Sequence, residues 1–239
     1  MAPYHIRTYQ DSDRKPVLDI FSSSLDEHVP ATFRHILWLP KTPLLELGVP
    51  LSLLLVSGSW LLAITSSLTL FLFLCFLDRC PWKQYMATTL HTDMADITKS
   101  YLSACGSCFW VAESRGQIVG TVCAVPVENP PLGKKQLELF HLTVAMEHRG
   151  ERIEKNLVRT VLQFARDQGC VEVVLATSVI QRSALALYQG ISEFTVVATT
   201  YSSDSFNIPT PFCSRWGPVI YFPCINKILI ESSAVTTEI

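Results

Sequence analysis

The sequence predicts a mixed α/β fold that is interrupted by a membrane-embedded segment, and three observations lead to this prediction. Short apolar or alternating segments, typical of strands, follow one another with amphipathic helical segments between them. An apolar stretch without a charged residue, residues 47–77, interrupts this alternation. A strand-like segment and a short helical segment precede the stretch, so we expect it to lie within a domain that continues after it.

The first elements are predicted before the apolar stretch. Residues 4–9 alternate between apolar and polar side chains, which is typical of a strand. Asp11 and Asp13 favour a helix N-terminus, and Val17 and Phe21 contribute to an apolar face for the short helix that follows. The chain is therefore expected to enter the apolar stretch from a strand and a helix.

The apolar stretch is too long for an ordinary soluble element. As one helix its 31 residues measure roughly 46 Å, whereas the hydrocarbon core of a bilayer is about 30 Å thick. It is therefore one strongly tilted helix or part of two passes, and Ser57, Gly58 and Ser59 favour a turn between two halves. The alternative, a buried core helix of a soluble domain, is disfavoured by the length.

The segment after the stretch resumes the alternation. Pro81 is expected to break the chain, and Gly106 to end a helix over residues 93–102. The pattern around residues 114–117 predicts a tight turn in a hairpin, and Gly169 is the expected cap of an amphipathic helix over residues 151–167. The other predicted elements are strands at residues 108–113, 118–127, 137–144, 171–176, 195–200 and 219–222 and a helix at residues 181–189.

The composition excludes several classes of protein. A length of 239 residues fits one substantial domain with extra segments or two small domains. The formal net charge is -2 without a basic excess, so no nucleic-acid partner is expected. Eight dispersed cysteines fit a reduced, cytosol-facing environment. Cys105 and Cys108 have the spacing of half a zinc site but no matching second pair, so no metal is expected.

Several motifs resemble those of the GNAT acetyltransferase superfamily. They lie at residues 110–113, 118–120, 139–144, 147–150 and 186–189. Three further segments are similar to the N-acetyltransferase-8-like, or camello-like, membrane subgroup, and together the matches cover roughly residues 1 to 190. These segments are residues 59–63, 92–102 and 158–169.

The resemblance implies a membrane-bound N-acetyltransferase with a GNAT-like acetyltransferase fold. Acetyl-CoA is the implied co-substrate, and the implied acceptor is a small-molecule or protein amine, either the α-amine of a cysteine S-conjugate or a protein lysine. If residues 4–9 form the first strand of the same sheet, the insert has to enter and leave on one side of the membrane, as a helical hairpin in contact with lipid. The implied location is the endoplasmic reticulum or Golgi membrane, with the catalytic domain facing the cytosol.

This interpretation divides the chain into four parts. Residues 1–35 hold the first strand and helix of the acetyltransferase fold, residues 36–80 hold the membrane-embedded helices, and residues 81–225 hold the main acetyltransferase domain. Residues 226–239 are expected to be a C-terminal tail.

The resemblance also implies site residues. Tyr188 is the implied general acid near the sulfur of CoA. His141 and Glu138 are the candidate bases; they are three positions apart on one strand, so they are expected to face opposite sides of it. Backbone N–H groups and a helix N-terminus are implied to hold the pyrophosphate. The implied cofactor-binding residues are Leu142, Thr143, Val144, Arg149, Gly150, Glu151, Arg152, Ile153, Glu154, Lys155, Gln181 and Ala184.

The phosphate-binding motif departs from the superfamily signature at two positions. That signature has Gln or Arg, two residues, Gly, one residue and a small residue, whereas this chain carries Arg152 at the glycine position and Glu154 at the small position. Arg152 is expected to crowd the pyrophosphate unless its guanidinium group swings out and pairs with it. The charge of Glu154 repels phosphate. These departures leave open an alternative: a catalytically degraded relative that acts as a membrane interaction protein.

Overall fold

The computed structural model describes most of the chain as two compact units. The described residues are 4–38, 41–127, 135–175, 177, 181–191, 195–197 and 227–231. One unit combines Met1–Ser24 with Thr89–Ile239, and the other is Leu25–Thr88. The sheet belongs to the first unit, and the second unit is helical. The boundaries of the predicted parts 1–35, 36–80 and 81–225 stay a prediction.

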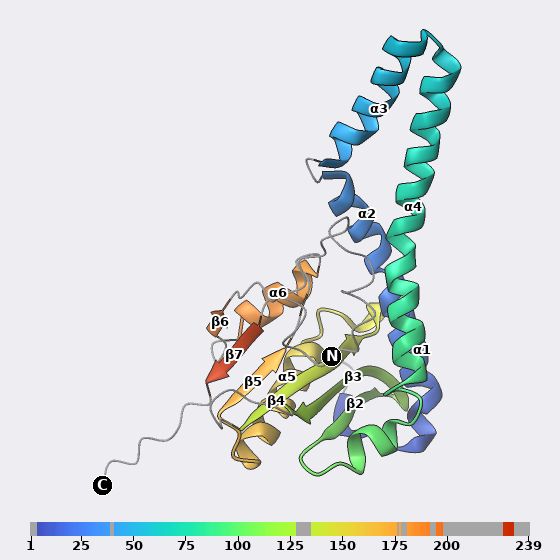
Figure 1. Ribbon diagram of the computed structural model, residues 1–239. Helices are drawn as coiled ribbons and strands as arrows, with labels where there is room; N and C mark the ends of the chain where they lie inside the picture. Colours follow the sequence, from blue (N-terminus) through green and yellow to red (C-terminus); the bar gives the residue numbers. More distant parts are fainter. Residues whose placement is uncertain are drawn as a thin grey trace. The chain divides into compact units, whose positions relative to one another are not determined.

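The sheet has seven strands among the described residues, in the order β1-β2-β3-β4-β5-β7-β6 (Figure 1). All neighbours pair antiparallel except β4 and β5, which are parallel. This mixed sheet with helices confirms the predicted α/β fold class. The strands are β1 (Tyr4–Thr8), β2 (Cys108–Ser114), β3 (Gln117–Pro126), β4 (Gln136–Val144), β5 (Glu172–Leu175), β6 (Thr195–Val197) and β7 (Lys227–Glu231).

The pairing of β1 with β2 joins two distant parts of the sequence. Tyr4 lies opposite Ser114 and Thr8 lies opposite Trp110, so the strand before the helical unit and the strand after it are neighbours in one sheet. The Arg7 guanidinium reinforces the pairing, because its Nε lies 2.7 Å from a carboxylate oxygen of Glu113 on β2. The first predicted strand is thus part of the acetyltransferase-like sheet.

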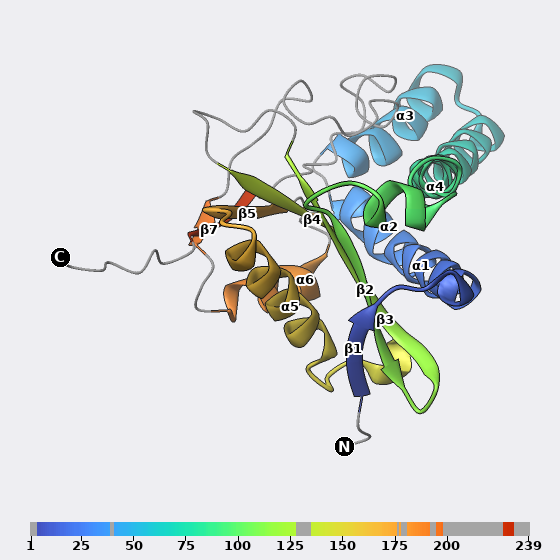
Figure 2. The same cartoon turned by 90° about the horizontal axis from the view of Figure 1, so that it is seen from below.

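Helices cover both faces of this sheet (Figures 1 and 2). On one face, α5 (Ile153–Asp167) lies against β2, β3, β4 and β5, and α6 (Arg182–Gln189) lies on the same side (Figure 2). On the other face lie α1 (Arg14–Asp26) and a π-helical turn, η2 (Thr98–Leu102), which contacts β2 and β3.

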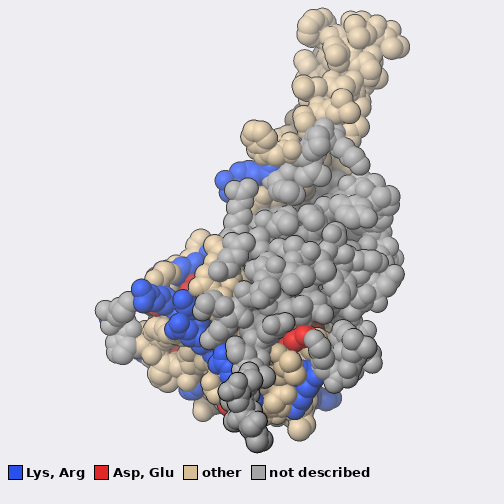
Figure 3. Space-filling view, turned by 90° about the vertical axis from the view of Figure 1, so that its left-hand side faces the viewer, with Lys and Arg blue, Asp and Glu red and all other residues tan. Residues whose placement is uncertain are grey.

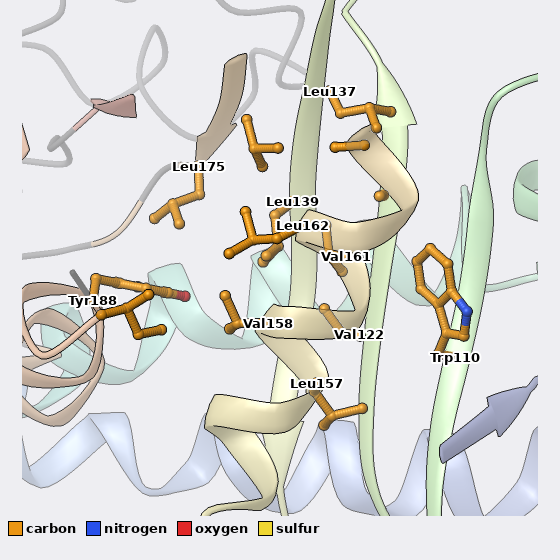
Figure 4. Packing of buried hydrophobic residues seen from close by; sticks show 14 of the residues in the cluster. Trp110, Val122, Leu137, Leu139, Leu157, Val158, Val161, Leu162, Leu175 and Tyr188 are labelled. Atoms are coloured by element: carbon orange, nitrogen blue, oxygen red, sulfur yellow. The ribbon is translucent and has the colours of Figure 1, made fainter. Parts of the chain in front are cut away.

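The core lies between α5 and the sheet because α5 is amphipathic. Its apolar side chains recur three or four positions apart and form one buried stripe, while the opposite side carries charged and polar residues. Figure 4 shows Leu157, Val158 and Val161 of this stripe packed against side chains of β3 and β4. The buried residues of α5 are Ile153, Leu157, Val158, Val161, Leu162 and Ala165.

Three sequence predictions about local structure are wrong. The helix expected over residues 93–102 is reduced to the turn η2, because residues 92–96 form turns and a bend. Pro81 does not break the chain, since α4 (Trp60–His91) continues through it. The segment expected as a C-terminal tail contributes β7, which pairs with β5 at Val173 and Ile230. The strand predicted at residues 219–222 lies outside the described residues.

The helical unit contains α2 (His28–Trp38), α3 (Lys41–Ser57) and most of α4. A turn at Gly58, whose φ is 64°, joins α3 to α4 where the sequence predicts it. Large apolar side chains are exposed on both sides of this turn, and the end of the unit that carries it shows no charged side chain in Figure 3. Examples are Leu55, Val56, Trp60 and Leu61.

A helix that spans a membrane needs sufficient length and an apolar composition. Among the described residues, no single helix meets both criteria. A bent pair, Asp11–Trp38 with Thr42–Ser57, meets them together, and Trp60–Phe76 is a shorter apolar helix.

Candidate active site

A β-bulge in β4 is the central irregularity of the sheet. Thr121 of β3 lies opposite Thr143, whereas Cys123 lies opposite Phe140, so two residues of β4 oppose one residue of β3. His141 is the extra residue, and its φ of 51° is left-handed. Such backbone is uncommon for residues other than glycine and concentrates at functional sites. The Thr121 hydroxyl donates a hydrogen bond of 3.0 Å to the His141 carbonyl oxygen and thereby fastens the bulge.

The bulge reverses the predicted orientation of His141. Leu139 and Leu142 pack in the α5 core, so regular alternation would also place His141 on the α5 side. Its ring instead lies against Phe21 and Tyr101, on the face of α1 and η2. Glu138, next to Leu139 on a regular part of β4, points to that same face. The prediction that His141 and Glu138 face opposite sides is therefore wrong, because the bulge adds one residue between them.

His141 belongs to a hydrogen-bonded cluster with Asp93 and Tyr101. Its Nε2 lies 2.6 Å from Asp93 Oδ2 and 3.1 Å from the Tyr101 hydroxyl oxygen. The Tyr101 hydroxyl donates to the same Asp93 oxygen, and the Thr92 hydroxyl donates to Asp93 Oδ1 at 2.9 Å. The side chain of His141 is 5% exposed and that of Asp93 is 33% exposed. The cluster is thus largely withdrawn from solvent, with its open side at Asp93.

Asp93 is ionised in this cluster. Burial would raise the pKa of Asp93, but hydrogen bonds from His141 and Tyr101 and the attraction of His141 lower it to about 2, so the group is a carboxylate. Burial raises the pKa of Tyr101 above its usual value, and the nearby Cys123 thiol and the Asp93 charge raise it further. Burial also raises the pKa of Cys123. Tyr101 and Cys123 therefore stay protonated beside the carboxylate.

A second group of predicted residues surrounds the start of α5. The parallel pairing of β4 with β5 ends at Leu139 and Leu175, although β4 continues to Val144. The chain then makes a 3₁₀ turn, η4 (Met146–His148), and reaches α5 through left-handed residues at Gly150, with φ 80°, and Arg152, with φ 65°. Beyond Leu139, the two parallel strands therefore no longer pair with each other.

The N-terminus of α5 can receive an anion. The first N–H groups of a helix have no partner within it and carry the positive end of its dipole. In α5 these belong to Ile153, Glu154 and Lys155, since the first helical bond runs from the Asn156 N–H to the Arg152 carbonyl. The side chain of Arg152 is exposed, so it lies outside the apolar core.

Arg149 and the residues of α6 complete the predicted set. Arg149 is exposed, and its Nε donates a hydrogen bond of 3.3 Å to the Val144 carbonyl oxygen. Gln181 precedes α6 and accepts a hydrogen bond of 2.9 Å from the Thr177 hydroxyl. Ala184 packs against the α5 core. Tyr188 lies within that core beside Val158 (Figure 4), and burial raises its pKa, so it stays a protonated phenol.

The structure separates the predicted residues into two groups. Val144, Ile153 and Tyr188 share the apolar cluster on the α5 face, whereas His141 and Glu138 lie on the opposite face. Asp93 and Tyr101 were missed by the sequence reasoning. Both lie within residues 92–102, one of the segments that carry the family resemblance. That resemblance is the one feature of the sequence that pointed to these two residues.

Comparisons with known proteins agree with this fold. The family profile described as "Acetyltransferase (GNAT) family" matches residues 74–191. The chain is 63% identical to N-acetyltransferase 8F1 of Rattus norvegicus over 191 residues, which cover 80% of this chain and 86% of that protein. It is 56% identical to N-acetyltransferase family 8 member 3 of Mus musculus over 224 residues, which cover 91% and 99%. It is also 62% identical to N-acetyltransferase 8B of Homo sapiens, with 80% and 84% covered.

Solved structures show the same fold at low identity. A GNAT-family acetyltransferase from Staphylococcus aureus superposes with a TM-score of 0.55 at 15% identity, covering 96% of this chain and 99% of that one. The PaiA N-acetyltransferase from Thermoplasma acidophilum, solved in complex with coenzyme A, gives a TM-score of 0.51 at 12% identity, covering 96% and 98%.

Proposed function

The chain belongs to the GNAT acetyltransferase family, with the N-acetyltransferase 8 proteins as relatives, and we propose that it is a membrane-bound enzyme that transfers acetyl from acetyl-CoA to an amine. One observation carries the proposal: the bulge in β4 turns His141 onto the partly buried Asp93 carboxylate just beyond the point where β4 stops pairing with β5. A base of this kind suits an acceptor that arrives as an ammonium ion.

The reaction needs a donor, a base and an acid. Acetyl-CoA supplies a thioester; the amine nitrogen forms a bond to its carbonyl carbon, the C–S bond breaks, and the thiolate takes up a proton. In this proposal, His141 accepts the ammonium proton. Tyr188 keeps its hydroxyl proton, so it retains the protonation state that a general acid needs.

The start of α5 is the proposed binding site for the pyrophosphate. The N–H groups of residues 153–155, the left-handed turn at Gly150 and the exposed cation Arg149 suit a phosphate anion. Arg152, whose side chain is exposed, is a second cation beside these N–H groups. Glu154, half-buried in the first turn, is the one residue of this group whose charge opposes phosphate.

Membrane attachment is proposed from the apolar surface of α3 and α4. Exposed side chains such as Val56 and Leu61 would be covered by lipid. Because β1 and β2 are neighbours in one sheet, a membrane segment between them has to return to the side it started from. The proposal therefore keeps a helical hairpin, in endoplasmic reticulum or Golgi membranes with the sheet on the cytosolic side. A hydrophobic cysteine S-conjugate would partition into the same lipid; a protein lysine is the other proposed acceptor.

A catalytically degraded membrane interaction protein is the second candidate, and Arg152 and Glu154 are the observations that favour it. Calorimetric titration of the detergent-solubilised chain with acetyl-CoA distinguishes the two functions. We expect the unmodified chain to bind, and Arg152→Gly/Glu154→Ala to bind more tightly. Arg115→Gly is the matched control, since it removes another left-handed arginine in the β2–β3 turn. Binding by the double variant alone would support the degraded relative.

The hairpin has its own test. Tags at the two ends of the chain, in sealed microsomes treated with protease, should be cleaved together or protected together. Protection of one tag and cleavage of the other would exclude a hairpin and require a single pass.

A further inference from the structure

We propose that Asp93 and Tyr101 are positioning residues: they hold His141 with its proton on Nε2, so that Nδ1 is the atom that accepts the proton of the acceptor amine. This inference rests on the proposed function, which it deepens by naming the atom that acts as base and the side chains that prepare it.

The hydrogen bonds determine which nitrogen carries the proton. An ionised carboxylate only accepts hydrogen bonds, so the 2.6 Å contact between Asp93 Oδ2 and His141 Nε2 requires a proton on Nε2. Tyr101 cannot donate a hydrogen bond to an unprotonated Nε2, because its hydroxyl proton is already donated to Asp93. In the neutral imidazole the other nitrogen, Nδ1, then carries the lone pair.

The ring is also held in orientation. Phe21 meets it edge-on, with ring centroids 5.2 Å apart and planes at 90°, and Tyr101 meets it at 6.2 Å and 89°. The backbone of His141 is fixed by the bulge and by the hydrogen bond from Thr121. The ring of Phe21, the ring of Tyr101 and the fixed backbone thus each restrict the orientation of the His141 ring. Such restriction, together with a left-handed φ, is expected of a side chain that has to direct one nitrogen at a substrate.

Proton transfer balances without another reactant. The acceptor ammonium gives a proton to Nδ1, directly or through one water molecule, and the imidazolium that forms is stabilised by the Asp93 carboxylate. The amine then forms the N–C bond as the C–S bond breaks. Of the two protons that leave the nitrogen, one ends on the departing thiolate and the other, held by His141, is released to water. Tyr101, Cys123 and Glu138 are further titratable groups on this face, and Tyr9 packs on the same Phe109 ring as Tyr101.

The tautomer can be observed without turnover. We expect ¹⁵N spectra of histidine-labelled protein in detergent, recorded along a pH series up to the neutral form of the ring, to show a protonated Nε2 and an unprotonated Nδ1 for one ring, assigned by its loss in His141→Gln. Asp93→Asn should change that ring to a mixture of tautomers, while Asp96→Asn, an exposed neighbour, should leave it unchanged. A ring protonated on Nδ1 in the unmodified chain would overturn the proposal, whether or not the chain is active.

Kinetics test the consequence for catalysis. With acetyl-CoA and S-benzyl-L-cysteine or a lysine peptide as acceptor, we expect Asp93→Asn to lower kcat by about 100-fold and Tyr101→Phe by roughly 10-fold, with KM for acetyl-CoA nearly unchanged. Tyr9→Phe is the control for Tyr101→Phe, because both rings pack on Phe109. Full kcat in Asp93→Asn would reject the positioning role and leave the acetyltransferase standing. An unmodified chain that binds no acetyl-CoA would reject the proposed function instead, and the spectra would still decide the tautomer.

Discussion

The two units of the molecule treat apolar side chains in opposite ways. In the sheet unit, Leu157 of α5 is 0% exposed, and the polar residues of α5 lie on its other side. In the helical unit, Val56 is 88% exposed and Leu61 is 76% exposed, and no charged residue occurs between positions 47 and 77. A helix with one apolar stripe needs a partner surface, whereas a helix that is apolar all round needs an apolar solvent or a larger core. The same amino acids therefore stabilise the two units through different surroundings.

The largest expected effect is on membrane binding by the exposed apolar surface of the helical unit. Leu55→Lys/Leu61→Lys places two charges on the exposed apolar surface, and each costs about 2.5 to 3.5 kcal/mol at the centre of a membrane helix. We expect the doubly substituted chain to leave the membrane fraction in a flotation assay with phospholipid vesicles. The matched control, Ala104→Lys/Gln163→Lys, adds the same charge to exposed positions of the sheet unit and should float like the unmodified chain. Equal flotation of both variants would contradict the lipid interpretation of the helical unit.

A smaller effect is expected in the core. Leu157→Ala removes a fully buried side chain between α5 and the sheet, and a change of this kind costs about 2 to 5 kcal/mol. Leu61→Ala removes an exposed side chain and should change the free energy of unfolding by less than about 0.5 kcal/mol in detergent. Urea unfolding followed by tryptophan fluorescence measures both. If the two substitutions lower the free energy of unfolding by the same amount, Leu157 and Leu61 would not differ in burial in solution as they do in the structure.

Much of the fold follows from local sequence patterns. The 3.6-residue period of α5, the alternation in β1 and the glycine turn at Gly58 were each readable from a short window of sequence. The continuation of α4 through Pro81 could not be predicted from such a window, because a proline can be accommodated where neighbouring turns keep the helix in place.

The candidate site was less predictable. His141 was identified as a candidate base through the family resemblance, but its direction depends on a bulge, which is decided by how β3 and β4 pair. Its partner Asp93 lies 48 positions earlier in the chain, so no local pattern joins them. Tyr101 belongs to a segment whose predicted helix is only a π-helical turn.

The partly buried Asp93 carboxylate makes the stability of the sheet unit depend on pH. The turn at Gly58 in the helical unit lies in a stretch without charged residues, so it makes no such contribution. The pKa of Asp93 is about 2 in the folded chain, below the ordinary value of 3.8 that it regains on unfolding. Its interactions therefore stabilise the fold fully above pH 4 and are lost as the pH falls toward 2. Discounted for partial exposure, this contribution is about 1 to 2 kcal/mol. Unfolding curves should therefore show Asp93→Asn less stable than the unmodified chain at pH 6, with the difference shrinking below pH 4. A difference that grows on acidification would contradict the assignment.

The smallest expected effect concerns left-handed residues. The helical unit uses glycine at its left-handed turn, whereas in the sheet unit Arg115, His141 and Arg152 adopt positive φ values without being glycine. A left-handed conformation costs a non-glycine residue about 1 to 2 kcal/mol, and glycine loses part of that advantage through the entropy of the unfolded chain. We expect Arg152→Gly and Arg115→Gly each to stabilise the fold by about 0.5 to 1 kcal/mol in the same urea assay. If acetyl-CoA binding improves only in Arg152→Gly, the arginine at the start of α5 hinders the anion itself, because relief of strain is common to both variants.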